Sequence, residues 1–392
     1  MPTNETLIGQ RVTQSDVARV AGVHNTTVSL SLRNCPSIPE ATRKRIRALA
    51  DAMGYYPDPA LQALIAYRKG RPSNRQKATL AYLTNWSSRW GWRALPAHER
   101  SYLGAQRKAA ELGYQLEHFW LGEPGMNQRR MSQMLYHRGI NGVLVAAHGE
   151  TSDELSEIDW SKLSAVKIGC FPPAPALHRV IEDHTGMVRL ATRRIQAAGF
   201  ERIGLVLGQG WDDFVDQAWS AGYLIEQSKF PASRRIPILR LARVQREWRP
   251  GQSEQKSLCE LAAFGRWYQD YRPEVIVGSS LAVLGKIGQL GLAVPRDVAY
   301  VDLCLDGVDS GVAGVRQNGE IAGEVATAML VGQIQQNLRG APAVATSTMV
   351  DGTWIDGPSM PTVLASGRGA EALAACEHLA ENALRSSQPV WV

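Results

Sequence analysis

Cysteine is scarce in this 392-residue sequence, and its placement excludes two common ways of holding a fold together. The five cysteines are scattered, odd in number and form no Cys-x-x-Cys pair. Neither a disulfide framework nor a structural zinc site is therefore expected. The eight histidines show no metal-ligand spacing either. We expect neither a bound metal nor a cofactor.

Long apolar runs are also missing. No stretch reaches the roughly 18 residues that a membrane-spanning helix needs, and the N-terminus has no apolar segment typical of a signal peptide. The hydrophobic content of 44% is typical of a globular protein. We expect a cytoplasmic protein that does not associate with a membrane.

Recognisable catalytic motifs are absent as well. The segment GLVLGQG, at residues 204–210, is a poor match to a phosphate-binding glycine-rich loop. No Ser, His and Asp residues stand in the sequence context of a nucleophilic triad. We expect a binding protein with no catalytic residues.

Net positive charge is confined to the N-terminal fifth of the chain. Residues 1–77 hold 12 Lys and Arg against 5 Asp and Glu, a net charge of +7. The remaining residues hold 31 basic against 32 acidic side chains, a net charge of −1. A phosphate backbone attracts such a cationic unit whatever the base sequence. This asymmetry indicates a small nucleic-acid-binding unit attached to a larger one.

The segment over residues 12–32 has the sequence VTQSDVARVAGVHNTTVSLSL. Two short helical patterns flank Gly22, which has no Cβ and takes a positive φ at little cost. Ala18 lets the two helices approach each other, and Val28 fills the angle between them. The pattern predicts a helix-turn-helix unit, whose second helix enters the DNA major groove. An ordinary helical hairpin is the alternative, and the charge distribution favours DNA binding.

A third helix is expected to begin at Pro39 and Glu40 and to end before Gly54. Its apolar face carries Ile46 and Leu49, and its other face carries four consecutive or nearly consecutive cations over residues 43–47. Such a run is usually a solvated face, but next to a helix-turn-helix pattern it also fits a phosphate backbone.

Residues 12–67 resemble the headpiece of the LacI/GalR family of bacterial transcriptional regulators. The matching pieces are DVARVAGV (16–23), TTVS (26–29), IPEATRKRIRALADAMGY (38–55) and PDPALQAL (57–64). The resemblance extends more weakly to about residue 357. It implies a dimeric regulator, usually a repressor, that binds a palindromic operator in double-stranded DNA and responds to a small-molecule effector. A sugar- or nucleotide-active enzyme with a DNA-binding head, or a constitutive regulator without effector, is the alternative.

The resemblance places the start of the second helix against base edges. Asn25 can pair with adenine, and Thr26 can touch a thymine methyl group or a phosphate; for Thr26 and Thr27, helix capping is an equal alternative. His24 is expected either to cap the helix or to contact a phosphate. Leu30 departs from the usual Arg and cannot bond to guanine. The full set of expected DNA contacts in the headpiece is Thr13, Gln14, His24, Asn25, Thr26, Thr27, Ser29 and Arg33.

Residues 57–77 resemble the hinge helix of the family, followed by a basic linker. Leu64 falls where the family places a leucine that wedges into a central base step of the minor groove. Leu61, where the family usually has Ala, is also assigned to this DNA surface. The alternative is that both leucines form a packing stripe.

Residues 78–360 alternate short apolar runs with amphipathic helical stretches, the pattern of parallel sheets covered by helices. The fold class expected is therefore a small all-α helix-turn-helix domain over residues 1–56, followed by an α/β two-lobed, periplasmic-binding-protein-like domain that binds the effector and dimerises. Strands are predicted at 80–83, 114–119, 142–146, 166–169, 180–181, 203–207, 236–239, 275–278 and 299–303. Helices are predicted at 101–112, 128–138, 187–198, 213–227, 258–268, 281–290 and 321–338.

The expected effector pocket lies between the lobes, beyond the carboxyl ends of the strands. The sugar-binding relatives that the resemblance implies carry an Arg at the position of Trp219 and Asn-Asp at the positions of Ser279 and Ser280. Because both anchors are missing, we hypothesise that a carbohydrate or related polar metabolite is held by aromatic stacking. Core packing is the alternative for any single Trp. The expected ligand contacts are Trp86, Trp90, Trp92, Asp183, Trp211, Trp219, Ser280 and Asp302.

The C-terminal segment, residues 361–392, is predicted to be partly helical. Its leucines are too few and too irregularly spaced for the leucine heptads through which some family members tetramerise. A homodimer is therefore favoured.

Overall fold

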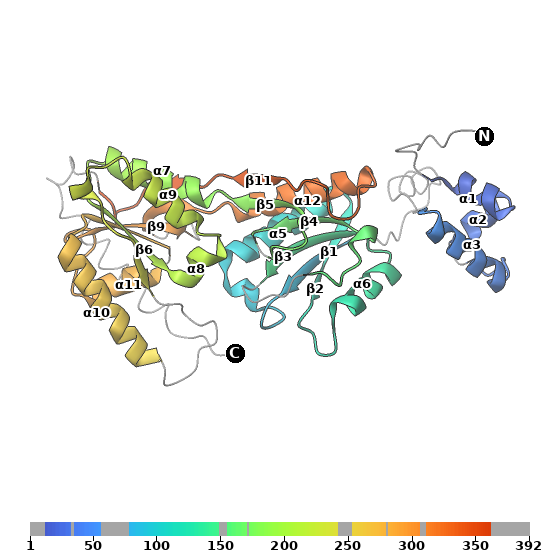
Figure 1. Cartoon of the computed structure of the whole chain (residues 1–392), viewed down its shortest axis with the longest axis horizontal. Helices are drawn as coiled ribbons and strands as arrows, with labels where there is room; N and C mark the ends of the chain where they lie inside the picture. Colours follow the sequence, from blue (N-terminus) through green and yellow to red (C-terminus); the bar gives the residue numbers. More distant parts are fainter. Residues whose placement is uncertain are drawn as a thin grey trace. The chain divides into compact units, whose positions relative to one another are not determined.

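The computed structural model describes residues 12–32, 35–55, 78–148, 155–170, 172–241, 253–279, 281–305 and 311–361 (Figure 1). The chain divides into two compact units, Met1–Gln76 and Lys77–Val392, which we describe separately. Several parts of the prediction lie outside the described residues. These are the hinge with Leu61 and Leu64, the C-terminal segment from residue 362, Arg33 and Ser280. No helix among the described residues is long and apolar enough to cross a membrane.

The first unit contains the three predicted helices, α1 (Gln14–Ala21), α2 (Asn25–Leu32) and α3 (Glu40–Ala52). Thr13 begins α1 with a capping box, because the Asp16 N–H donates to Thr13 Oγ1 at 3.3 Å and the Thr13 N–H donates to Asp16 Oδ2 at 3.0 Å. Gly22 ends α1 with a φ of 66°, the left-handed conformation that glycine adopts most readily.

The three helices of the headpiece pack around one small core. Val17, Val28 and Ile46 are fully buried there, one from each helix. Two cations of α3 also join the helices: Arg45 donates to the Ala21 carbonyl at 3.3 Å, and Arg47 donates to the Ser31 carbonyl at 3.2 Å. Part of the predicted cationic face therefore satisfies carbonyls at the ends of α1 and α2.

The first lobe of the second unit is built on a six-stranded parallel sheet of order β11-β5-β4-β3-β1-β2. Its strands are β1 (Ala78–Asn85), β2 (Tyr114–Trp120), β3 (Gly142–His148), β4 (Ser164–Ile168), β5 (His178–Glu182) and β11 (Ser347–Val350). Its helical elements are η1 (Gly91–Ala94), α5 (Pro96–Glu111), α6 (Gln128–His137), η2 (Trp160–Lys162) and α12 (Gly319–Gln335). Alternate residues of β1 enter two cores, with Leu80 facing α5 and α12 and Ala81 facing the side of α6.

The second lobe contains a sheet of order β12-β10-β9-β8-β6-β7, in which only the pairing of β12 with β10 is antiparallel. Its strands are β6 (Ile203–Gly208), β7 (Leu239–Leu241), β8 (Val275–Gly278), β9 (Ala299–Leu305), β10 (Ala313–Arg316) and β12 (Thr353–Ile355). Its helical elements are α7 (His184–Ala197), α8 (Gln209–Phe214), α9 (Ala218–Gln227), η3 (Ala232–Arg234), α10 (Ser253–Tyr271) and α11 (Leu281–Gln289).

The chain crosses between the lobes three times: after β5, after β10 and after β11. Helix α12 and strand β11 consequently join the first lobe although they follow the strands of the second lobe in sequence (Figure 1). The predicted fold class, a small helical helix-turn-helix domain followed by two α/β lobes, is confirmed. Strands β10, β11 and β12 were not among the predicted elements.

The helix predicted over 213–227 is wrong as one element, because it is broken into α8 and α9. Asp216 and Gln217 have positive φ angles of 55° and 57° and end the first helix. The buried Asp212 carboxylate holds the break: it accepts from the Ser220 N–H at 3.2 Å and from Arg240 at 2.7 Å.

The strand predicted at 236–239 is displaced, since the ladder of β7 begins only at Leu239. Side chains of α9, rather than a neighbouring strand, form hydrogen bonds with the backbone N–H and carbonyl of Ile236. The Ile236 N–H donates to Gln227 Oε1 at 3.0 Å, and the Tyr223 hydroxyl donates to the Ile236 carbonyl at 2.8 Å. The apolar pattern of this segment therefore reflects packing under a helix.

Candidate functional site

The first candidate site is the exposed start of α2 in the headpiece. The Thr26 N–H donates to His24 Nδ1 at 3.3 Å, and the Thr26 hydroxyl lies 3.0 Å from the same nitrogen. His24 therefore caps α2, one of the two roles expected for it. Asn25 and Thr26 are exposed beside it, whereas Thr27 and Ser29 are half-buried. The first turn of α2 thus offers amide and hydroxyl groups to a partner.

Thr13 and Gln14 begin α1. Thr13 is exposed and engaged in the capping box, and Gln14 is half-buried. The predicted contacts of the headpiece therefore come from the N-terminal ends of two helices. Helix N-termini carry partial positive charge and suit phosphate groups.

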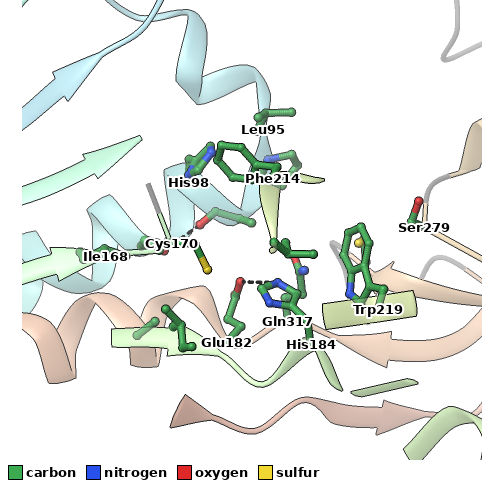
Figure 2. Close-up of a pocket in the computed structure, with 18 of the residues that line it drawn as sticks. Leu95, His98, Ile168, Cys170, Glu182, His184, Phe214, Trp219, Ser279 and Gln317 are labelled. Carbon is green, nitrogen blue, oxygen red and sulfur yellow. Dashed lines mark hydrogen bonds and ion pairs between the residues drawn. The ribbon is translucent and has the colours of Figure 1, made fainter. Parts of the chain in front are cut away.

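The second candidate site is a cavity of about 390 Å³ between the two lobes of the larger unit. It lies at the carboxyl ends of β4 and β5, against the start of α5 and the break between α8 and α9 (Figure 2). Its apolar wall includes Leu95, Pro96, Ala97, Ile168, Val180, Phe214, Val215, Trp219, Ala282 and Ala322. His98 from the first lobe and Phe214 from the second meet edge to face, with ring centroids 5.8 Å apart.

Glu182 and His184 place a titratable pair on the wall of this cavity. The carboxylate oxygen Oε2 lies 3.6 Å from His184 Nε2, and the two side chains expose only 14% and 10% of their surfaces. Figure 2 shows the carboxyl group beside the imidazole, with Trp219 beyond it. The His184 and Trp219 rings meet edge to face at 5.4 Å.

Burial sets the charge state of this pair. It raises the pKa of Glu182 to about 7 and lowers the pKa of His184 to about 4, the latter opposed by the charge of Asp183. Both shifts favour the neutral forms. Burial also raises the pKa of the Cys170 thiol on the same wall.

Two polar atoms of the cavity wall have no hydrogen-bond partner among the described residues. They are Glu182 Oε1 and the indole nitrogen of Trp219, whose side chain is almost entirely buried. Buried polar atoms are nearly always paired with protein, water or ligand. Both atoms belong to residues that line the cavity.

The tryptophans of the loop after β1 lie elsewhere. Trp92 is fully buried in the first lobe and contacts the rings of Tyr82 and Tyr102. Trp90 is 45% exposed, with the Arg93 guanidinium 4.9 Å from its ring centroid. Trp86 is half-buried against the same core. The structure does not bring these three side chains into the cavity.

Of the other expected ligand contacts, Trp219 alone lines the cavity among the described side chains. Asp183 caps α7 instead, accepting from the Gly186 N–H at 2.8 Å. Asp302 is buried and accepts from the Tyr300 hydroxyl at 2.8 Å. Trp211 lies in α8, and its side chain is outside the described atoms. Ser279, next to Ser280, reaches the wall.

Sequence reasoning missed Glu182, His184 and Phe214. A signal was present: the polar triplet at 182–184 begins at the last residue of strand β5. Alternation along an extended chain sends Glu182 and His184 to one side and Asp183 to the other. Asp183 was chosen from this triplet, and its neighbours line the cavity.

Comparison with known proteins agrees with both units. Residues 13–58 match the family model described as bacterial regulatory proteins, lacI family. The chain is 28% identical over 187 residues to the sucrose operon repressor of Escherichia coli, an alignment that covers 48% of this chain and 53% of that protein. The chain thus matches about half the length of the first curated relatives.

Two solved structures share the fold over most of the chain. A transcriptional regulator CelR–cellobiose complex aligns with a TM-score of 0.52 at 20% identity, covering 88% of this chain and 99% of that one. The lac repressor dimer bound to operator and the anti-inducer ONPF aligns with a TM-score of 0.52 at 17% identity, covering 90% and 100%. Residues 13–58 therefore match the lacI family model, and the larger unit shares the fold of these solved structures.

Proposed function

We propose that this chain is a sequence-specific, DNA-binding transcriptional regulator, acting as a repressor, whose affinity for its operator is set by a small molecule bound between the lobes. The observation that carries the proposal is the exposed first turn of α2, held at a fixed angle by the headpiece core. A short helix presented in this way fits the major groove.

The headpiece supplies the two kinds of contact that such a regulator needs. Asn25 and Thr26 would read base edges, with Thr27 and Ser29 beside them. The positive charge of the N-terminal region would attract the phosphate backbone. We further propose that Thr13, Gln14, Arg33, Leu61 and Leu64 contribute to the DNA surface, as the family resemblance implies.

Dimerisation follows from the size of this surface. One short helix makes few base contacts, and two copies joined through the larger units would multiply two weak half-site affinities. The lac repressor structure is a dimer on its operator, which supports the same arrangement here. The operator is then a two-fold repeat with a fixed spacing.

Selection of bound duplexes from a random pool tests the proposal. The full chain should recover a two-fold symmetric motif, and Asn25→Ala should relax preference at one position in each half. Recovery of sequences without a common motif, at moderate salt, would contradict a sequence-specific regulator. The Glu157→Gln variant, altered on an exposed side chain of the first lobe, serves as the control.

A constitutive regulator without effector is the second candidate, since the sugar anchors expected from the resemblance are missing. The cavity between the lobes, with two unpartnered polar atoms on its lining residues, favours an effector. The enzyme alternative has less support, because the curated relatives are named as repressors and transcriptional regulators.

A further inference from the structure

The chemistry of the cavity wall indicates what kind of effector it takes. Most of the wall is apolar, with aromatic faces supplied by Phe214 and Trp219. An apolar wall of this kind stabilises a ligand by removing its nonpolar surface from water. The ligand body is therefore compact and largely apolar.

The described part of the cavity wall contains an acidic side chain but no Lys or Arg. Among the lining residues that the structure describes there is no Lys and no Arg, and Glu182 is the one carboxyl group. Two cations on neighbouring strand positions are engaged elsewhere: Lys167 donates to the Pro172 carbonyl at 2.6 Å, and Arg179 donates to Ser347 Oγ at 2.7 Å. A phosphate or carboxylate ligand would find no described Lys or Arg on the wall to neutralise it.

The two unpartnered atoms, Glu182 Oε1 and the indole nitrogen of Trp219, indicate which hydrogen-bonding groups the ligand should carry. Glu182 Oε1 needs a hydrogen-bond donor, and a positively charged donor would also compensate the buried carboxylate. The Trp219 N–H needs an acceptor. Phe214 and Trp219 line the same cavity, and their ring faces would attract a positively charged ligand through cation–π interaction.

We propose that the cavity binds a compact amine with an apolar body, its ammonium group paired with the Glu182 carboxylate and its acceptor atom, where it has one, with the Trp219 indole N–H. This deepens the proposed function and rests on it, because it names the class of effector. It replaces the hypothesis of a carbohydrate stacked on Trp86, Trp90 and Trp92, whose side chains lie outside the cavity wall.

Calorimetric titration of the full chain with a matched series of probes tests this assignment. The amines are cyclohexylamine, phenethylamine and tryptamine; 2-phenylethanol is the neutral analogue, 3-phenylpropanoate the anionic analogue, and cellobiose the carbohydrate. At least one amine should bind at least about tenfold more tightly than the alcohol and the carbohydrate, because it adds a charge-assisted hydrogen bond. The anion should not bind.

Variants assign the binding to the cavity. Glu182→Gln keeps the shape of the side chain and should weaken the best amine on the order of tenfold or more, while the affinity for 2-phenylethanol changes by less than about threefold. Glu157→Gln should change neither. Circular dichroism confirms that each variant is folded.

Binding of cellobiose in preference to every amine would overturn the inference, as would no amine binding at millimolar concentration, or amine affinity unchanged by Glu182→Gln. Selection of DNA without ligand separates this test from that of the proposed function. A duplex motif without amine binding overturns the effector class alone. Amine binding without any duplex preference would contradict the proposal of a sequence-specific regulator but would still support the proposal that the cavity binds an amine.

Discussion

At the scale of single residues, the buried Glu182 carboxyl group is the most consequential side chain of the larger unit. Its raised pKa means that ionisation is easier in the unfolded chain than in the folded one. A group of this kind contributes stability that is complete below its ordinary pKa near 4.5 and is lost as the pH rises through about 7. His184 acts in the opposite sense, losing its contribution as the pH falls from its ordinary value near 6.5 through about 4.

The first prediction follows from these signs. Between pH 5 and pH 8 the free energy of unfolding should fall further in the natural chain than in Glu182→Gln, by about 1–3 kcal/mol. The variant removes only the Glu182 contribution, since His184, His98 and Cys170 on the same wall are unchanged. Urea unfolding at several pH values measures the difference. Parallel pH profiles for the two proteins would refute the raised pKa, and Glu157→Gln should follow the natural chain.

Asn25 carries the second prediction at this scale. A bidentate contact to a base discriminates against other bases by about 1–3 kcal/mol. Asn25→Ala should therefore weaken binding to the selected operator by that amount and leave binding to random duplex unchanged, measured by fluorescence anisotropy. Equal losses on both duplexes would show that Asn25 makes no base contact.

Replacing a cation that faces the phosphate backbone should, unlike Asn25→Ala, weaken binding to every duplex by a similar factor. Lys44 is exposed on α3 and pairs with Glu40 one turn away. If it also faces phosphate, Lys44→Gln should weaken specific and random duplexes alike and reduce the salt dependence of binding by about one counterion.

At the scale of elements, the crossing of α5 and α12 fixes how the chain returns to the first lobe. A Cβ at Gly104 would lie 2.0 Å from the Glu320 carbonyl oxygen, and one at Gly323 would lie 2.0 Å from the Ser101 carbonyl oxygen. The two helices therefore touch backbone to backbone. The start of α5 lines the cavity, so this contact also supports the ligand site.

Gly104→Ala is therefore expected to destabilise the larger unit by about 1–3 kcal/mol through overpacking against a backbone that cannot yield locally. Gly332→Ala, on the same α12 with open space around the added methyl group, should be neutral or stabilising by about 0.5–1 kcal/mol. Thermal unfolding of both variants measures the contrast. Equal effects would show that the close helix contact is wrong.

The elements also show how far sequence reasoning reaches. Periodicity located most strands and helices because each apolar run is buried within its own element, as in β1 and β9. It failed where distant partners decide. The break after α8 depends on Arg240, which is 28 residues from Asp212, and the segment before β7 is held by side chains of α9. No local pattern contains these contacts.

The candidate site divides along the same line. Trp219 was found because it replaces an expected Arg, and it does line the cavity. The Trp cluster after β1 was misplaced because an aromatic-rich loop looks alike whether it faces a ligand or a core, and Trp92 completes the core. Glu182 was missed because the polar triplet at 182–184 does not show which of its members faces the cavity, and Asp183 was chosen from it.

At the scale of the whole molecule, the proposed mechanism couples two binding events in one chain. In this proposal an effector that binds between the lobes would change their relative closure, and a dimer would transmit that change to the spacing of its two headpieces. The coupling is reciprocal, so operator DNA must change effector affinity by the same factor as effector changes operator affinity. The sign of this coupling distinguishes an inducer from a co-repressor.

The most direct test is a competition measurement with the full chain on its selected duplex. At about 150 mM salt, scrambled duplex of the same length should compete at least about a thousandfold more weakly than the selected sequence. The shift in that ratio on adding the best-binding amine measures the coupling. Equal competition by selected and scrambled duplexes, with and without the amine, would contradict the account.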